Sequence, residues 1–185
     1  MKCVIAEERI DYDGSQIGSL WAYTRFGIQD DSIVCFRGAC DIPLKHMIDL
    51  EDRIHEERIE SPDMIHFIAE HFDAPSLKMA YARQRLLACI AGETLKDGGF
   101  IVSRKGDDLF YGGGKLSISI ASTSAVSSKI HFGINVECEE YMSLSKMGLR
   151  DAGGLMWQIG ERYALEMEDV EKDMRKSRPL EVFGL

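Results

Sequence analysis

Hydrophobic positions in the first part of the chain alternate between strand-like and helix-like spacing. Residues 1–10 and 31–42 predict two strands, and Gly38 inside the second indicates a bulge or a close approach of another backbone segment. Between these strands, apolar residues at helical spacing predict a helix over 15–27. Residues 43–60 are acidic and show no clear period.

Two helices are predicted before the next group of strands. Ser61 as an N-cap and Pro62 in the first turn, followed by apolar residues, predict a short helix over 61–72. A longer helix is predicted over 76–96, where apolar residues follow one side and an Asp-Gly-Gly sequence ends the pattern.

The second half of the chain contains a run of predicted strands and one long amphipathic helix. The strands are expected at 100–105, 107–111, 115–123 and 129–137. A Tyr-Gly-Gly-Gly-Lys sequence joins the second and third as a hairpin, because glycine readily adopts the positive φ of a tight turn. The apolar side of the last helix carries Met156, Ile159, Gly160, Tyr163, Met167, Val170 and Met174. With no repeat or linker, these elements predict one α+β domain over 1–185, an antiparallel sheet flanked by helices.

The strand after the glycine turn has one apolar and one small polar face. Side chains alternate along a strand, so Leu116, Ile118 and Ile120 share one face. The other face carries Lys115, Ser117, Ser119 and Ala121, and the next strand adds His131, Gly133 and Asn135 opposite its own apolar residues. If both apolar sets face one core, the polar face is either the floor of a ligand site or a solvated surface. The floor interpretation makes Ser117, Ser119 and His131 ligand contacts, although a lone histidine is more often structural.

Charged side chains around the hairpin are candidates for binding a phosphorylated or acylated small molecule. Lys115 offers a point charge to a phosphate or a polarised carbonyl. Asp107 and Asp108, on the facing arm, are placed to bind a Mg²⁺ that accompanies a phosphate. Arg37 and Arg104 are candidate phosphate contacts from residue type and placement, because a guanidinium binds phosphate in a bidentate way.

Composition and charge narrow the partners that we expect. The net charge of −9 argues against non-specific nucleic-acid binding, which requires a basic surface. The sequence shows no secretory signal and no membrane-spanning run, so we expect a cytoplasmic protein that does not enter membranes. The five cysteines are expected as free thiols, and Cys35 and Cys40 lack the second pair that a zinc site needs, so no metal site is assigned.

Two resemblances place the hairpin in a wider context. The run DDLFYGGGKLSISIAS at 107–122, followed by IHFGINVE at 130–137, resembles the biotin and lipoate protein ligases, which share the core of the class II aminoacyl-tRNA synthetases. A nearly full-length resemblance is to a prokaryotic family of unknown function, domain of unknown function 366. It is carried by DYDGSQI, FRGACDI, MIHFIAEHF and the hairpin sequence itself.

The resemblance implies a ligase-like fold and assigns roles to hairpin residues. In those ligases the hairpin lysine contacts the acyl carbonyl and the α-phosphate of ATP as an acyl-adenylate forms. Lys115 and Asp108 are thereby implied as catalytic residues, with Gly113, Gly114 and Asn135 as ligand contacts and with ATP and Mg²⁺ as cofactors. The arginine- and glycine-rich nucleotide loop of those ligases has no counterpart in this sequence, and Ile118 or Ser119 stands where they have a glycine.

Three functions therefore remain open from the sequence. The first is a nucleotide-dependent ligase or acyl or nucleotidyl transferase that acts on a small molecule. The second is a small-ligand-binding module that retains the fold without adenylation. The third is a structural homodimer built through the amphipathic C-terminal helix.

Overall fold

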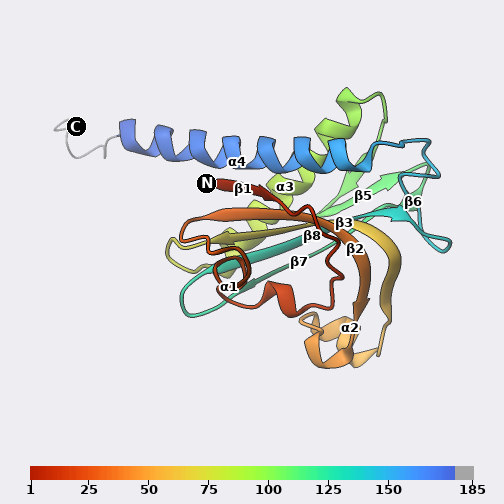
Figure 1. The fold of residues 1–185 in the computed structure, drawn as a ribbon, viewed down its shortest axis with the longest axis horizontal. Helices are drawn as coiled ribbons and strands as arrows, with labels where there is room; N and C mark the ends of the chain where they lie inside the picture. Colours follow the sequence, from red (N-terminus) through yellow and green to blue (C-terminus); the bar gives the residue numbers. More distant parts are fainter. Residues whose placement is uncertain (178–185) are drawn as a thin grey trace.

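The protein is built around a five-stranded sheet that carries helices on one face (Figure 1). The computed structural model describes residues 1–177. The strand order is β1-β2-β3-β8-β7, in which β1 runs parallel to β2 and the other neighbours are antiparallel. The strands span Lys2–Ile5 (β1), Ser32–Ile42 (β2), Ile59–His71 (β3), Ser117–Thr123 (β7) and Ser128–Glu137 (β8).

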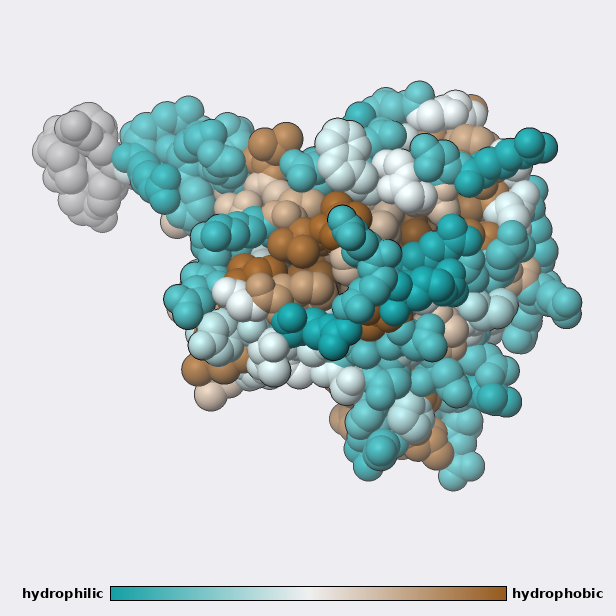
Figure 2. All heavy atoms as spheres, viewed as in Figure 1, coloured by the Kyte–Doolittle hydropathy of each residue, from teal (hydrophilic) through white to brown (hydrophobic). Residues whose placement is uncertain are grey.

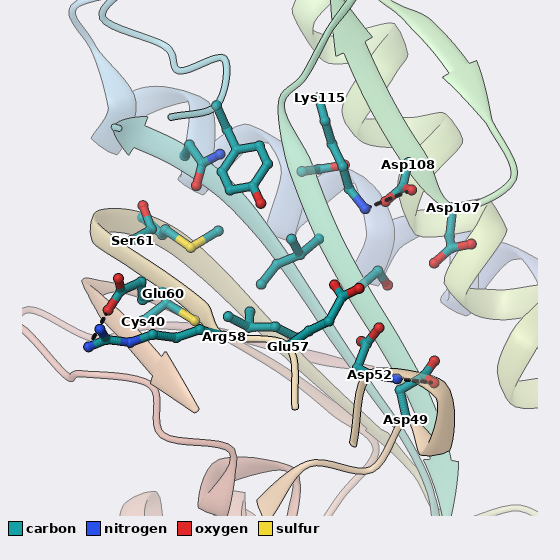
Figure 3. Close-up of a pocket in the computed structure, with 17 residues that line it drawn as sticks. Cys40, Asp49, Asp52, Glu57, Arg58, Glu60, Ser61, Asp107, Asp108 and Lys115 are labelled. Carbon is teal, nitrogen blue, oxygen red and sulfur yellow. Dashed lines mark hydrogen bonds and ion pairs between the residues drawn. The ribbon is translucent and has the colours of Figure 1, made fainter. Parts of the chain in front are cut away.

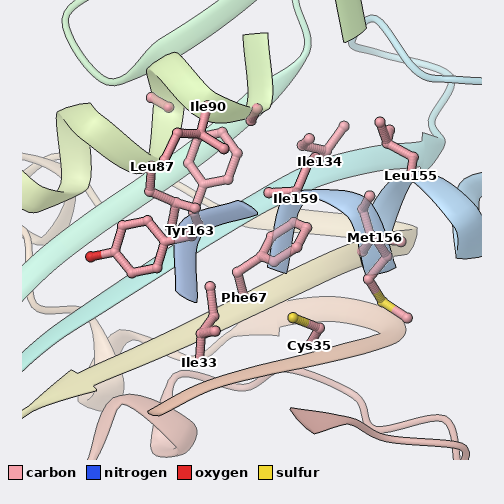
Figure 4. Close-up of a cluster of buried hydrophobic side chains, with 14 of the residues drawn as sticks. Ile33, Cys35, Phe67, Leu87, Ile90, Ile134, Leu155, Met156, Ile159 and Tyr163 are labelled. Carbon is pink, nitrogen blue, oxygen red and sulfur yellow. The ribbon is translucent and has the colours of Figure 1, made fainter. Parts of the chain in front are cut away.

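Two long helices, α3 (Leu77–Asp97) and α4 (Ala152–Lys176), cover one face of this sheet. The side chains between them and the sheet form the larger hydrophobic core. Figure 4 shows this core, to which β2, β3 and β8 contribute Ile33, Cys35, Phe67 and Ile134, and the helices contribute Leu87, Ile90, Leu155, Met156, Ile159 and Tyr163. Burial of such side chains is the main term that stabilises the fold.

The opposite face of the sheet is covered by the chain that follows β1. This segment contains a short 3-10 helix, Ser15–Ile17, and α1, Trp21–Phe26. A second apolar cluster lies beneath it, formed by Tyr12, Ala22, Ile28, Val34, Phe36, Cys40, Met64 and Ile68. Because both faces are covered, central strands such as β3 are almost completely buried.

A small three-stranded sheet stands beside the main one and carries the glycine hairpin. Its strands are β4 (Ser103–Lys105), β5 (Asp108–Tyr111) and β6 (Gly114–Lys115), all antiparallel. Gly112 and Gly113 form the turn with φ values of 57° and 85°, as the glycine sequence predicts. The hairpin thus places Lys115 next to β7, the outer strand of the main sheet.

Residues 43–60 fold back over one end of the second face. They contain a 3-10 helix, Leu44–His46, and the short helix α2, Leu50–Ile54. Asp49 is the N-cap of α2, because its carboxylate accepts hydrogen bonds from the N–H groups of Glu51 and Asp52. This segment encloses the cavity described below.

The predicted helix at 61–72 is wrong, because these residues form most of β3. The side chains from Met64 to His71 are all buried, and they alternate between the two covered faces of the sheet. A strand buried on both faces reads as a continuous apolar run, which local spacing does not distinguish from a buried helix. Pro62 lies beside the bulge between Asp63 and Met64, where a missing N–H is tolerated.

Two other predictions are confirmed, and one predicted helix covers fewer residues than expected. The helix expected over 76–96 is α3, capped by the Ser76 hydroxyl, and the glycine at position 38 marks a bulge in β2. A Cβ on Gly38 would lie 2.0 Å from the carbonyl oxygen of Ile10, so the close backbone approach is also confirmed. The helix expected over 15–27 is α helical only over α1.

The predicted small polar sheet face is also wrong. Ser117, Ser119 and Ala121 pair in register with Ile134, Phe132 and Ile130, so they lie on the face that α3 covers. Ile118 and Ile120 point to the other face, beside Gly133 and His131. The serines are tolerated on the core side because their hydroxyls are hydrogen bonded: Ser117 Oγ accepts from the Leu109 N–H, and Ser119 Oγ accepts from Gln84 Nε2.

Candidate functional site

A cavity of about 300 Å³ lies between the hairpin, the end of the main sheet and residues 49–61 (Figure 3). The hairpin contributes Lys115, Asp108 and Asp107, which face the α2 segment across the cavity in the figure. The other lining residues are Cys40, Asp49, Asp52, Glu57, Arg58, Ile59, Glu60, Ser61, Met64, Ser117, Ile118, Ser119, Asn135 and Tyr141.

Lys115 is held at the cavity wall by an ion pair within the hairpin. Lys115 lies opposite Phe110 in the β5–β6 pairing, which makes Asp108 its diagonal neighbour on the same face. Lys115 Nζ lies 2.9 Å from Asp108 Oδ2, and the two side chains are 40% and 27% exposed. The ammonium group is therefore oriented by Asp108 while it remains accessible from the cavity.

Asp107 is anchored differently, through the buried side chain of Gln84 in α3. Gln84 Nε2 donates to Asp107 Oδ2 at 3.0 Å and to Ser119 Oγ at 2.8 Å. Sequence reasoning missed Gln84, because a glutamine inside an amphipathic helix gives no signal of a contact 23 residues away. The contact ties the hairpin to α3 at the cavity edge.

The charge of the cavity is strongly negative. Its lining has six carboxylates, Asp49, Asp52, Glu57, Glu60, Asp107 and Asp108, but only the two cations Arg58 and Lys115. Both cations are paired with carboxylates, Lys115 with Asp108 and Arg58 with Glu60 at 2.6 Å. Burial raises the pKa of Asp52, and the neighbouring carboxylates Asp49 and Glu57 raise it further.

A smaller cavity of about 60 Å³ adjoins the first and is mainly apolar. The two share the lining residues Asp49, Asp52, Ile59, Ile118 and Ser119, so they lie side by side, and together they are called the cleft below. The smaller cavity is an apolar slot lined by Tyr12, Ile42, His46, Met47, Ile48, Ile120 and His131 in addition to the shared residues.

One wall of the slot is a stack of buried aromatic rings. The rings of Tyr12 and His131 are parallel with centroids 3.7 Å apart, and His131 Nε2 lies 3.1 Å from Nδ1 of His66. Burial lowers the pKa of His66 to about 4 and holds the pKa of His131 well below its ordinary value. Both imidazoles are therefore neutral near pH 7, and each ring offers one donor and one acceptor nitrogen.

The structure brings together most of the residues predicted from the sequence. Lys115, Asp107, Asp108, Ser117, Ser119 and Asn135 line the larger cavity, and His131 lines the slot. Gly113 and Gly114 belong to the turn and to β6, outside the lining of either cavity. Their contribution is to the conformation of the hairpin that presents Lys115.

Two predicted phosphate contacts lie elsewhere. Arg37 binds the carboxylate of Asp63 through Nε and Nη2, an interaction that raises the pKa of the guanidinium. Arg104 is exposed in β4 and donates to the carbonyl of Gly106. Residue type and placement in the sequence suggested both as phosphate contacts. In the structure, each guanidinium binds a partner outside the cavity.

Within residues 1–177, no group of three or more His, Cys, Asp or Glu side chains is placed to hold a metal ion. No helix in the same part of the chain combines the length and apolar character needed to cross a bilayer.

Comparisons with known proteins agree with this architecture. Residues 1–178 match the family model described as Domain of unknown function (DUF366). An uncharacterized protein of Methanocaldococcus jannaschii is 41% identical over 97% of this chain and 86% of its own length. A solved protein of unknown function from Pyrococcus horikoshi is also 41% identical, with a TM-score of 0.92 over 97% of this chain and 98% of that one.

More distant solved structures share the fold. Biotin protein ligase from Aquifex aeolicus has a TM-score of 0.60 at 14% identity, over 96% of this chain and 72% of the ligase. A putative lipoate protein ligase from T. acidophilum with bound lipoic acid has a TM-score of 0.55 at 10% identity, over 89% and 84% of the two chains. The ligase-like fold implied by the hairpin sequence is confirmed.

Proposed function

The chain belongs to the DUF366 family, and we propose that its cleft binds a small molecule with one apolar and one polar end. One observation carries this proposal: Lys115, oriented by Asp108, stands at the wall of a cavity of about 300 Å³ that adjoins an apolar slot. Ligand sites commonly combine a concave apolar part with a few oriented polar groups.

The slot suits the apolar end of the ligand. Ile42, Ile59, Ile118 and Ile120 line it, and the stacked rings of Tyr12 and His131 form a flat wall. A volume of about 60 Å³ accommodates only a few carbon atoms, so the apolar group is short or enters the slot partially. Its burial contributes about 25 cal/mol for each Å² removed from water.

The larger cavity suits the polar end. Lys115 Nζ donates to a carbonyl or carboxylate oxygen of the ligand, while the surrounding carboxylates accept from its hydroxyl or amine groups. Asp107 is held in place by Gln84, so it requires little reorganisation when a ligand donor approaches.

The lining of the larger cavity does not fit a nucleoside triphosphate. A triphosphate would meet six carboxylates, and both lining cations are engaged with carboxylates. Like charges at short distance repel, and the repulsion is stronger in a partly desolvated cavity. We therefore derive no adenylation step, and ligand binding without a nucleotide is the function that the cleft supports best.

The second candidate is a ligase or an acyl or nucleotidyl transferase that uses the same cleft. The observation that favours it is the position of Lys115 at the end of the hairpin, beside the cavity. A cation placed there stabilises negative charge that develops on a carbonyl oxygen during acyl transfer. This function requires a nucleotide to bind despite the acidic lining, which can be measured directly.

A thermal-unfolding screen tests both functions. The probes are biotin, lipoate, octanoate, amino acids, ATP and GTP, each with and without Mg²⁺. The proteins are the wild type, Lys115→Ala and a matched control, Lys105→Ala, which removes an exposed lysine from the same small sheet outside the cavity. A ligand at one hundred times its Kd stabilises the fold by roughly 2.7 kcal/mol. For a chain of this size that raises Tm by roughly 5–10 °C.

The outcomes separate the candidates. A rise in Tm with a non-nucleotide probe supports the binding function if it is lost in Lys115→Ala and kept in Lys105→Ala. A Mg²⁺-dependent shift with ATP or GTP, also lost in Lys115→Ala, favours the transferase and overturns the electrostatic argument. An equal rise in Tm with a ligand in all three proteins would contradict any role of Lys115 in binding it.

A further inference from the structure

Strand β1 leaves one side of its backbone unpaired. In the parallel pairing of β1 with β2, the Lys2 N–H donates to Asp31 at 2.8 Å and the Ala6 N–H donates to Cys35 at 2.9 Å. Lys2, Val4 and Ala6 therefore direct their backbone groups toward β2. The N–H and C=O groups of Cys3 and Ile5 point to the opposite side, where residues 1–177 supply no further strand.

The same strand presents an apolar surface. Residues from Cys3 to Ala6 are uncharged and only half buried, and Figure 2 shows apolar atoms gathered over β1, below α4. Natural proteins protect free strand edges with charged residues, proline or a bulge. β1 is short and carries one such charge, Lys2, at its start, but from Cys3 to Ala6 the edge has no charge, proline or bulge.

We propose that β1 pairs with β1 of a second copy of this chain, antiparallel around a two-fold axis at Val4. In this register Cys3 lies opposite the partner's Ile5, and Ile5 lies opposite the partner's Cys3. Each opposed pair exchanges two N–H···O=C hydrogen bonds, so all the unpaired groups of both strands are satisfied. The two five-stranded sheets then join into one.

The opposite charges at the two ends of β1 favour antiparallel pairing with a second copy of this chain. Lys2 is exposed at the start of the strand, and Glu7 is exposed shortly after its end. In this register Lys2 lies opposite the partner's Ala6, one position from the partner's Glu7 in the bend that follows the strand, and the symmetry repeats this proximity. A parallel pair would instead place like charges side by side. Because the contact is two-fold symmetric, it closes as a dimer and leaves neither β1 edge free.

Disulfide cross-linking tests the register. In the proposed pair Val4 faces the partner's Val4 as a non-hydrogen-bonded pair, with Cα atoms about 4.5 Å apart, which is within the range that a disulfide spans. Native Cys3 faces an isoleucine instead. We expect Cys3→Ser/Val4→Cys to form a covalent dimer under mild oxidation, while the wild type stays uncross-linked through Cys3. Equal cross-linking of both proteins, or none in the double variant, would overturn this register.

Charge exchange tests the association without perturbing the core. Sedimentation equilibrium should show a dimer for the wild type. Lys2→Glu should raise the dimer dissociation constant by at least roughly 2- to 30-fold, because two favourable charge contacts are lost. Lys2→Glu/Glu7→Lys should restore it, since the pair is exchanged rather than lost.

A proline variant supplies an independent measurement. Cys3→Pro removes an outward N–H without removing a hydrogen bond to β2, and proline is tolerated on edge strands. We expect a monomer with a cooperative unfolding transition. A wild type that is monomeric up to millimolar concentration, or a dimer unaffected by Cys3→Pro and Lys2→Glu, would exclude the β1 interface.

Discussion

At the scale of single residues, the buried histidines show how the fold sets the chemistry of a side chain. His66 is completely buried between the rings of Phe36 and His131, and desolvation penalises its charged form. Tyr12 stacks on His131 and also lies close to His66, with ring centroids 3.7 Å and 5.3 Å apart. Of these rings, Tyr12 and His131 line the apolar slot, and their uncharged surface suits an apolar ligand group better than an imidazolium would.

The first prediction is a loss of stability in mild acid. A histidine whose pKa is 6.5 in the unfolded chain and about 4 in the fold binds its proton only after unfolding. The free energy of unfolding therefore falls as the pH drops from about 6.5 to about 4, by up to roughly 3 kcal/mol for His66. His131 adds to this loss, because its pKa is lowered as well. Urea unfolding across this pH range measures how steeply the free energy of unfolding falls with pH.

The matched variant for this prediction is His66→Phe. Phenylalanine keeps a ring next to Phe36 but does not titrate, so the slope between about pH 6.5 and about pH 4 should become shallower, even if the variant is less stable at neutral pH. An unchanged slope would mean that carboxylates, rather than this histidine, cause the acid sensitivity.

At the scale of elements, the packing of α4 on the sheet depends on one small residue. A Cβ on Gly160 would lie 2.5 Å from Sγ of Cys35 and 3.0 Å from Sγ of Cys3. Glycine lets the helix approach β1 and β2 closely at this position. The sequence places Gly160 on the apolar side of the helix, but the spacing does not reveal what it contacts.

The second prediction compares two glycines of the same helix. Gly160→Ala should reduce the free energy of unfolding by about 1–3 kcal/mol, because the helix or the cysteines must move. Gly153→Ala should leave it unchanged or raise it by up to about 1 kcal/mol, since its Cβ would meet only Asp151 Oδ1 at 3.8 Å and alanine favours helix. Urea unfolding of both variants provides the comparison. A similar loss in both would show that the close approach at Gly160 does not limit stability.

At the scale of the whole molecule, the last turns of α4 extend past the end of the sheet (Figure 1). Val170 and Met174 continue the apolar side of the helix, yet they are 42% and 64% exposed. The sequence predicted them as part of a buried face or a dimer seam. The core ends earlier along the helix, at Met167.

The third prediction is that this exposed end of α4 is not the dimer interface. Val170→Lys/Met174→Lys should change the free energy of unfolding by less than about 0.5 kcal/mol, as surface substitutions usually do. It should also leave the oligomeric state unchanged, because the proposed interface lies at β1. Sedimentation equilibrium and urea unfolding of the double variant measure both quantities. Dissociation of a wild-type dimer by this variant would place the interface on the helix instead.

Most elements could be predicted from the sequence because their signals are local. The Ser76 cap, the glycine turn and the apolar side of α4 each depend on residues within a few positions of one another. Strand β3 could not be identified this way, because its neighbours β2 and β8 lie far from it in the chain. Their contacts override the helix start signals of Ser61 and Pro62.

The sequence by itself determined that a hairpin presents Lys115 beside Asp108, since adjacent strands and a glycine turn bring these residues together. Only the tertiary structure decided which side chains of β7 face the core, which carboxylates surround Lys115 and that Arg37 binds Asp63. A shift of one residue in the pairing of β7 with β8 would exchange the two faces of β7. That register is set by hydrogen bonds to β8, β5 and α3, which are formed only when distant segments pack together.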